Sequence, residues 1–276
     1  MLVAGNLTFK GYKQGSNFEA RFGVVKGLIT NPSDSAEIFV ADYSYNCIRL
    51  IDRNLLKTSE LIGKCDSKGH ADGDPQTAQI GYPAELVKGM NQDIWFFDSF
   101  RPSLRRIYKE TNSNQWQLVT VHQLESRVES FTLHPSTNDI YLIRSKDVSR
   151  IRNSKEEVVF GESGMHNDGM LSEASIHYPK HSLFLDNDVF LLSDTGNNVI
   201  RIVNLKSSTI SSICVPRSPN NDIYRDGTPA ECLLKSPGHL IHLPENNEVV
   251  ATSDGVFFSL TYESEFIVVY AKFKVN

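Results

Sequence analysis

Residues 192–204 read Leu-Ser-Asp-Thr-Gly-Asn-Asn-Val-Ile-Arg-Ile-Val-Asn, and residues 40–52 repeat the pattern as Val-Ala-Asp-Tyr-Ser-Tyr-Asn-Cys-Ile-Arg-Leu-Ile-Asp. In both copies an apolar run ends in aspartate, a polar turn follows, and arginine stands seven residues after the aspartate. Such an aspartate can accept a hydrogen bond from a backbone N–H two residues on, while Asn and Gly tolerate the positive φ of a reversal. Each copy therefore predicts a β-hairpin, and the recurrence predicts a repeat architecture.

Weaker copies of the hairpin occur elsewhere in the chain. Asp98 is followed by Leu104 and Arg105 at the same offsets, and a C-terminal unit keeps Ser253-Asp254-Gly255 with a shorter turn. Residues 141–151 keep only strand character and an arginine. We expect four aspartates to be structural turn residues, namely Asp42, Asp98, Asp194 and Asp254.

A second motif precedes the hairpins. Four glycines are each followed five residues later by Ala or Cys, and three of them are followed ten residues later by Pro: Gly15, Gly73, Gly169 and Gly227. Three of these glycines follow aspartate, as expected for Asp-Gly turns, and a proline favours an extended segment. The complete unit therefore reads as a loop, two strands, a turn and two more strands.

This combination resembles the NHL-repeat family, in which an Asp-Gly loop, a Pro-initiated strand and a terminal Asp-Thr-Gly-Asn-x-x-Ile-Arg hairpin form one blade. The resemblance implies an all-β fold, a β-propeller of four-stranded blades around a central channel. Five blades are visible in residues 1–276, which we expect to form a single domain. Residues 2–5 resemble a fourth strand whose blade lies elsewhere, so we favour six blades in a chain trimmed from a longer protein.

Composition narrows the classes of partner. The chain of 276 residues is 40% hydrophobic and carries a net charge of −5. That charge counts against a nucleic-acid footprint, because phosphate binding needs clustered positive charge. There is no run of 18 apolar residues, so we expect no membrane contact within the chain. We also expect a monomer.

The cysteines bear on the cellular compartment. There are four, Cys47, Cys65, Cys214 and Cys232. If a hairpin turns within residues 54–58, Cys47 faces Cys65 at about 4.5–5.5 Å between Cβ atoms, close to bridging distance. Cys214 and Cys232 flank a long loop between two strands. Two disulfides would indicate an oxidising, extracellular or lumenal compartment; the alternative is four reduced, buried cysteines in a cytoplasmic protein.

One glycosylation sequon begins at Asn6, and it supports the extracellular hypothesis. We treat it as minor support, because a single Asn-x-Ser/Thr sequence arises readily by chance. No cofactor is expected from the remaining common motifs, since Gly-x-Ser-x-Gly, P-loop and His-Glu-x-x-His patterns are absent from the sequence.

The starts of the innermost strands hold the candidate metal ligands. In a propeller these positions line the channel, and here they include Glu85, His181 and His239. Two imidazoles and a carboxylate suit zinc and related ions. The segment Pro179–Leu183 is similar to the Pro-His-Ser-Leu of peptidyl-amidating lyases, with one residue inserted, and this resemblance implies a channel metal. The alternative is that these polar residues only line a water-filled channel.

Three functions follow from these observations. The leading hypothesis is a non-catalytic propeller of a secreted or cell-surface protein, presenting loops on its rim to a protein ligand. The second is a channel-metal enzyme resembling the amidating lyases, which leaves enzymatic activity open. The third is an intracellular RNA-binding NHL domain, against which the acidic balance counts.

Overall fold

The computed structural model describes residues 4–5, 9–31, 33–161, 166–214, 225–262 and 271–274. Within these residues the chain is all-β and forms five antiparallel sheets, each with four principal strands, as in a five-bladed β-propeller. The chain divides into two compact units, Met1–Arg127 and Val128–Asn276. The all-β prediction is confirmed, and the repeats at Asp42, Asp98 and Asp194 each fall on one sheet.

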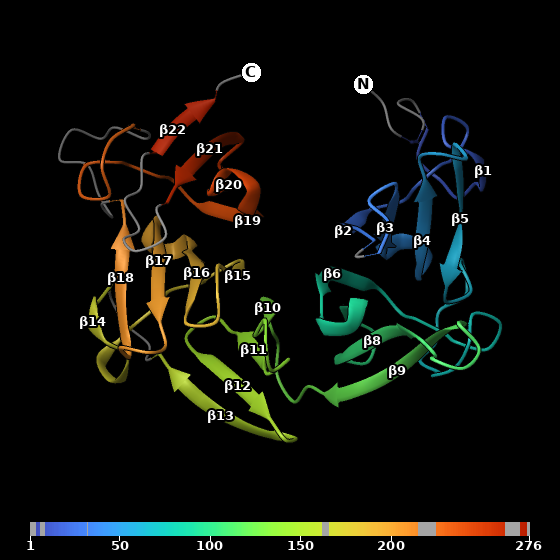
Figure 1. Cartoon of the computed structure of the whole chain (residues 1–276), viewed down its shortest axis with the longest axis horizontal. Helices are drawn as coiled ribbons and strands as arrows, with labels where there is room; N and C mark the ends of the chain where they lie inside the picture. The colour runs from blue at the N-terminus through green and yellow to red at the C-terminus, as the bar shows by residue number, and fades with distance from the viewer. Residues whose placement is uncertain are drawn as a thin grey trace. The chain divides into compact units, whose positions relative to one another are not determined.

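The first unit contains blades I and II (Figure 1). Blade I consists of β2 (Val25–Thr30), β3 (Glu37–Asp42), β4 (Cys47–Asp52) and β5 (Lys57–Ile62). Blade II consists of β6 (Pro83–Lys88), β7 (Ile94–Asp98), β8 (Ser103–Lys109) and β9 (Trp116–Gln123). The innermost strands, β2 and β6, contact one another.

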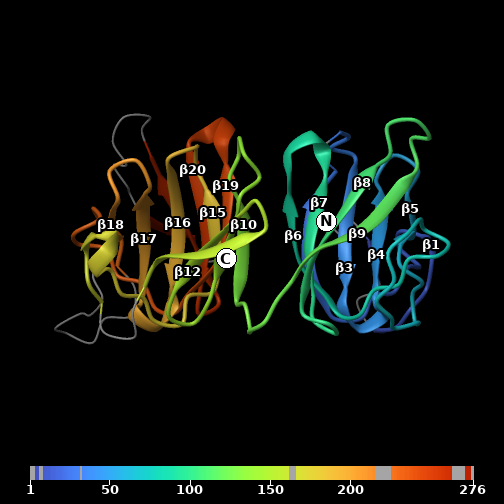
Figure 2. The same ribbon diagram turned by 90° about the horizontal axis from the view of Figure 1, so that it is seen from below.

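The second unit contains blades III, IV and V (Figure 2). Blade III consists of β10 (Ser130–Leu133), β11 (Ile140–Ile143), β12 (Val148–Arg152) and β13 (Lys155–Phe160). Blade IV consists of β15 (Ser182–Phe184), β16 (Val189–Asp194), β17 (Val199–Asn204) and β18 (Thr209–Ile213). Blade V consists of β19 (Pro237–Leu243), β20 (Glu248–Ser253), β21 (Val256–Thr261) and β22 (Ala271–Lys274).

Neighbouring blades pack face to face through apolar side chains. Alternation along a strand places residues such as Phe39 and Ala41 on one face of β3, where they join Ile80 and Phe96 between blades I and II. Similar clusters lie between blades III and IV, around Tyr141 and Phe190, and between blades IV and V, around Cys232 and Phe258. Each core is therefore shared by two blades.

The loops that contain Gly15, Gly73 and Gly169 each add an outer segment to their own blade. β1 (Gly15–Ser16) pairs with β5, and β14 (Gly169–Met170) pairs with β18. In blade II, Gly73 exchanges two backbone hydrogen bonds with Leu118 of β9. These glycines have φ between +121° and +140°, a conformation that L side chains rarely adopt.

Turn chemistry follows the sequence expectation at the hairpins. A short 3₁₀ turn follows β3 and another follows β16, and each ends in a left-handed asparagine, Asn46 with φ +57° and Asn198 with φ +60°. The sixth blade stays a prediction, because it needs chain outside this sequence. Of the strand expected at residues 2–5, residues 2 and 3 lie outside the described residues, and residues 4 and 5 form a bend.

Candidate functional site

Three blades share a buried aspartate–arginine pair. The Nη1–Oδ2 distances are 3.4 Å for Arg49–Asp42, 3.0 Å for Arg105–Asp98 and 3.1 Å for Arg201–Asp194. All six side chains are inaccessible to solvent. Each aspartate also accepts a hydrogen bond from a backbone N–H ahead of the first strand, donated by Gly23, Gly81 or His177. These aspartates therefore join a hairpin to the segment that enters the blade.

The same arginines fasten the Asp-Gly loops. Arg105 donates through Nη2 to the carbonyl oxygen of Ala71 at 2.8 Å and to Asp72 at 2.9 Å. Asp72 in turn accepts from the backbone N–H and the hydroxyl of Thr120 on β9. In blade IV, Asp168 bonds Arg201 and Ser212 in the same way. One buried guanidinium thus connects the turn, the loop and the outermost strand.

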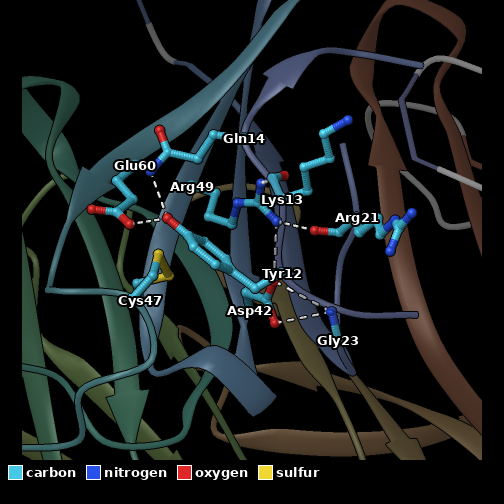
Figure 3. Close-up of a disulfide and its surroundings, with 10 residues drawn as sticks. Tyr12, Lys13, Gln14, Arg21, Gly23, Asp42, Cys47, Arg49 and Glu60 are labelled. Carbon is cyan, nitrogen blue, oxygen red and sulfur yellow. Dashed lines mark hydrogen bonds and ion pairs between the residues drawn. A yellow bond between two sulfur atoms is a disulfide. The ribbon is translucent and has the colours of Figure 1, made fainter. Parts of the chain in front are cut away.

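In blade I the second acidic neighbour of the buried arginine comes from a different position in the blade (Figure 3). Gln14 stands where the other loops carry aspartate, and Glu60 stands on β5 where Thr120 stands on β9. Tyr12 donates its hydroxyl to Glu60. Burial lowers the pKa of Arg49, and the charges of Asp42 and, less strongly, Glu60 oppose that shift. The acidic residue thus lies on β5 in blade I and in the loop in blades II and IV, and the arginine has a second acidic neighbour in each case.

Desolvation makes each buried charge dependent on its partner. Burial raises the pKa of Asp42 and Asp194, and it lowers the pKa of Arg49 and Arg201. Both shifts disfavour the charged form, and the hydrogen bonds within each pair oppose them. Removing one partner would leave an uncompensated buried charge.

Blades III and V alter the pair at both positions together. By strand register, Arg144 follows β11 where Asp42 ends β3, and Ser149 takes the place of Arg49. The Arg144 guanidinium donates to the Ser149 hydroxyl at 2.8 Å and lies 2.6 Å from Glu156. In blade V the two positions hold Ser253 and Phe258.

Asp254 occupies a different place from the other three predicted aspartates. Ser253 takes the register position of Asp42, since it pairs with the first residue of its inner strand, and its hydroxyl exchanges hydrogen bonds with the backbone of Lys235. Asp254 lies in the exposed two-residue turn, with φ +43°, and its carboxylate is 2.7 Å from Nζ of Lys235. It shapes a surface turn and not a buried pair.

The two predicted histidines meet in the second unit. The ring centroids of His181 and His239 are 5.0 Å apart, at the starts of β15 and β19. Nδ1 of His181 accepts a hydrogen bond from the backbone N–H of Leu240 at 3.3 Å, which places the ring proton of the neutral imidazole on Nε2. Burial, aided by His239, lowers the pKa of His181 to about 3. His181 is thus a neutral residue that links two inner strands.

The third predicted ligand lies in the other unit. Glu85 is in β6, at a bulge against β7, with φ +49°. No group of three His, Cys, Asp or Glu side chains placed to hold a metal occurs among the described residues. The donor atoms of His181 also fit a metal poorly, because Nδ1 is engaged and Nε2 carries the proton. Asn6 lies outside the described residues.

Two disulfides join the predicted cysteine pairs. Cys47 bonds Cys65 and Cys214 bonds Cys232, with Cα separations of 5.0 and 4.5 Å. The first pair differs from expectation in register: β4 and β5 pair Asp52 with Lys57, so Cys65 lies beyond the strand and not directly across from Cys47. The second disulfide connects blade IV to the start of blade V. The pairs are typical of an oxidising compartment.

A groove opens between blades III and IV, and sequence reasoning missed it. Its volume is about 720 Å³, and its lining includes Tyr141, Val158, Met170, Leu205 and Ser208. This volume lies within the range of ligand pockets. Val158 is 66% exposed and Met170 is 49% exposed. The groove is therefore an accessible, partly apolar surface.

Comparison with the junction of blades I and II explains why the groove exists. There, Trp116 packs edge-on against Phe39, with ring centroids 5.7 Å apart. By strand register, Tyr141 is the counterpart of Phe39. Ser208 is the counterpart of Trp116, because each stands four residues before an equivalent residue of the fourth strand, Ser212 and Thr120. A small residue thus replaces the indole. Aligning the third and fourth strands of the repeats would have revealed this signal.

Comparisons with known proteins support the fold and leave the family open. No family model matches the chain, and no curated protein matches it. Among solved structures, it resembles a catalytically inactive virginiamycin B lyase from Staphylococcus aureus with quinupristin: TM-score 0.56, 15% identity, covering 98% of this chain and 73% of the lyase. A chain of the nidogen/laminin complex has TM-score 0.58 and 11% identity, with 86% and 76% covered.

A third similar structure is an auxiliary nutrient binding protein from Bacteroides thetaiotaomicron. Its TM-score is 0.51 at 15% identity, with 99% of this chain and 76% of that chain covered. At such low identities the likeness shows a β-propeller fold and nothing finer. Membership of the NHL-repeat family therefore stays a prediction.

Proposed function

We propose that this chain is a non-catalytic β-propeller domain of a secreted or cell-surface protein and that it binds a protein partner through its rim. The observation that carries the proposal is the groove between blades III and IV, with Val158 and Met170 exposed beside it. Exposed apolar side chains that gather around a hollow are typical of interaction sites. Rigid blades held by buried ion pairs would keep such a site preformed.

Two further observations support the proposal. Two disulfides fit a protein that works outside the reducing cytosol. The nidogen/laminin complex shows that a propeller-like chain of similar fold occurs in a protein–protein complex. Among the described residues, no helix is long and apolar enough to span a membrane.

Site-specific photo-crosslinking tests the proposal. A benzoylphenylalanine in place of Val158, in protein expressed through the secretory pathway, should crosslink one discrete partner protein from the extracellular or lumenal pool. The same residue in place of Val121, on the outermost strand of blade II and 42% exposed, is the matched control. Equal, diffuse labelling from both positions would contradict a specific rim site.

A channel-metal lyase is the second candidate, because His181 and His239 lie together and the chain resembles a lyase in fold. In that case His181 and His239 would supply imidazole ligands to the metal. Stoichiometric zinc by elemental analysis, lost in His181→Ala, would favour the lyase.

An RNA-binding domain is the third candidate. Salt-dependent retention of the protein on immobilised RNA would favour it over both other functions.

A further inference from the structure

The open edge of blade III is the first of two observations that define a binding site. In blades I, II and IV a loop segment that contains Gly15, Gly73 or Gly169 lies along the outermost strand. Within the described residues, β13 pairs only with β12, so its outer edge carries no such segment. Unpaired N–H and C=O groups on a strand edge are a template for another extended chain.

Blade III lacks all the residues that hold the outer segment in place in blades I, II and IV. Ser149 replaces the buried arginine, and Val158 replaces the hydroxyl or carboxyl residue that Thr120, Ser212 and Glu60 supply. Residues 122–129, which precede this blade, contain no glycine. The blade therefore neither provides nor anchors an outer strand of its own.

The adjoining groove is the second observation, and it indicates what a visiting chain would carry. Trp116 fills the corresponding space between blades I and II against Phe39. Between blades III and IV, Tyr141 is the counterpart of Phe39; its side chain is buried, and the ring of Phe184 packs edge-on against it with centroids 5.3 Å apart. An aromatic side chain from outside would occupy the space beside Ser208 that the indole fills in the other junction.

At the groove, blade III pairs its own charged side chains with one another. Arg150 donates through Nε to Glu157 at 2.9 Å, and Arg152 donates to Asp139 at 2.6 Å. Glu156 is similarly occupied by Arg144. The exposed apolar side chains at the groove are those of Val158 and Met170, and Asp188 and Lys206 of blade IV line it as well.

We infer that an extended segment of a partner protein adds a strand to the open edge of β13 and inserts an aromatic side chain into the groove between blades III and IV. Alternate residues of an added strand face one side of the sheet, so one side chain in two can enter the groove beside Val159. This inference rests on the proposed function and specifies the chemistry of its partner. The backbone of the partner segment would pair with β13 as β14 pairs with β18. Its aromatic side chain would fill the space that Trp116 fills between blades I and II.

Selection from a phage-displayed library of random nonapeptides on the intact, oxidised protein tests the inference. Selected peptides should share an aromatic position, and replacing that residue with alanine should weaken binding at least tenfold in isothermal titration. Val158→Glu and Met170→Glu should each weaken binding at least tenfold, while Val121→Glu should stay within twofold. All three side chains are exposed, so the thermal midpoints should change little.

Three outcomes would overturn the inference: no peptide is selected, selected peptides show no aromatic preference, or binding is unaffected by Val158→Glu and Met170→Glu. The proposed function would survive any of these if photo-crosslinking still captured a discrete partner at another rim position. Failure of the groove and failure of rim binding are therefore distinguishable.

Discussion

The Arg144 guanidinium donates a hydrogen bond to the Ser149 hydroxyl across 2.8 Å, at the two positions where blades I, II and IV hold a buried aspartate and arginine. Blade III has thus reversed the charge at the first position and removed it at the second. Asp147 and Glu156 surround Arg144 and balance it. Buried charges in this protein change in compensated groups, as the cost of an unpaired buried charge requires.

The buried pair in blade IV should show this compensation directly. Asp194→Ser alone leaves Arg201 short of one carboxylate, and we expect a loss of about 3 kcal/mol in the free energy of unfolding. Asp194→Ser combined with Arg201→Phe reproduces the residues of blade V and should cost less than Asp194→Ser alone. Urea unfolding of the two variants provides the comparison. A double variant less stable than Asp194→Ser would contradict the compensation.

The stability lost when the disulfide between blades IV and V is removed should depend on the residue that replaces Cys214. Cys214 has φ +68°, at the position where Gly63 and Gly161 have φ +80° and +117°. Removing a disulfide that spans 18 residues should cost about 3 kcal/mol. Cys214→Gly with Cys232→Ala should cost about 1 kcal/mol less than Cys214→Ala with Cys232→Ala, because glycine accepts the left-handed backbone without strain.

Chemical unfolding of both double variants under non-reducing conditions measures this difference. Cys232→Ala matches Ala78 and Ala174, which stand at the equivalent position in blades II and IV and are buried. Equal stability of the two double variants would show that the backbone at position 214 relaxes once the bond is removed.

Stability should fall in acid because of His181. Burial lowers its pKa to about 3 in the folded protein, below the ordinary value of 6.5. The unfolded chain therefore binds the proton first, and the stabilisation present above pH 6.5 is lost as the pH falls toward 3. The slope due to this group approaches about 1.4 kcal/mol per pH unit within that window.

Replacing His181 with glutamine should flatten that slope. Unfolding free energies measured at several pH values between 3 and 7 test it, with His122→Gln as the matched variant away from the pair. A slope unchanged by His181→Gln would show that other groups cause the acid sensitivity.

Trp116 should be needed to close the junction of blades I and II. Its ring packs on Phe39 and is only partly buried, so Trp116→Ser should cost about 2 kcal/mol, less than the 3–5 kcal/mol of a fully buried tryptophan. The variant should also expose a groove like that beside Ser208. Calorimetry measures the stability change, and increased binding of a hydrophobic dye reports the new groove. A variant as stable as the parent protein would contradict the role given to Trp116.

The fold could be predicted from the sequence because each turn of the repeat is determined by residues that are close together in the chain. The Asp194 hairpin, its left-handed Asn198 and the Asp-Gly loops all depend on nearby residues, and the cysteine pairs follow from strand order. The groove was missed because its signal is a difference between blades: Ser208 is informative only when it is aligned with Trp116. Asp254 was misplaced in the repeat because a shortened turn shifted the register by one residue.

Hydrogen exchange on the crosslinked or peptide-bound protein tests the central claim most directly. If a partner segment adds a strand to blade III, backbone amides of Lys155–Phe160 in β13 should gain protection on binding, while amides of Trp116–Gln123 in β9 should not change. Protection confined to other rim segments, with β13 unaffected by a bound partner, would contradict the account.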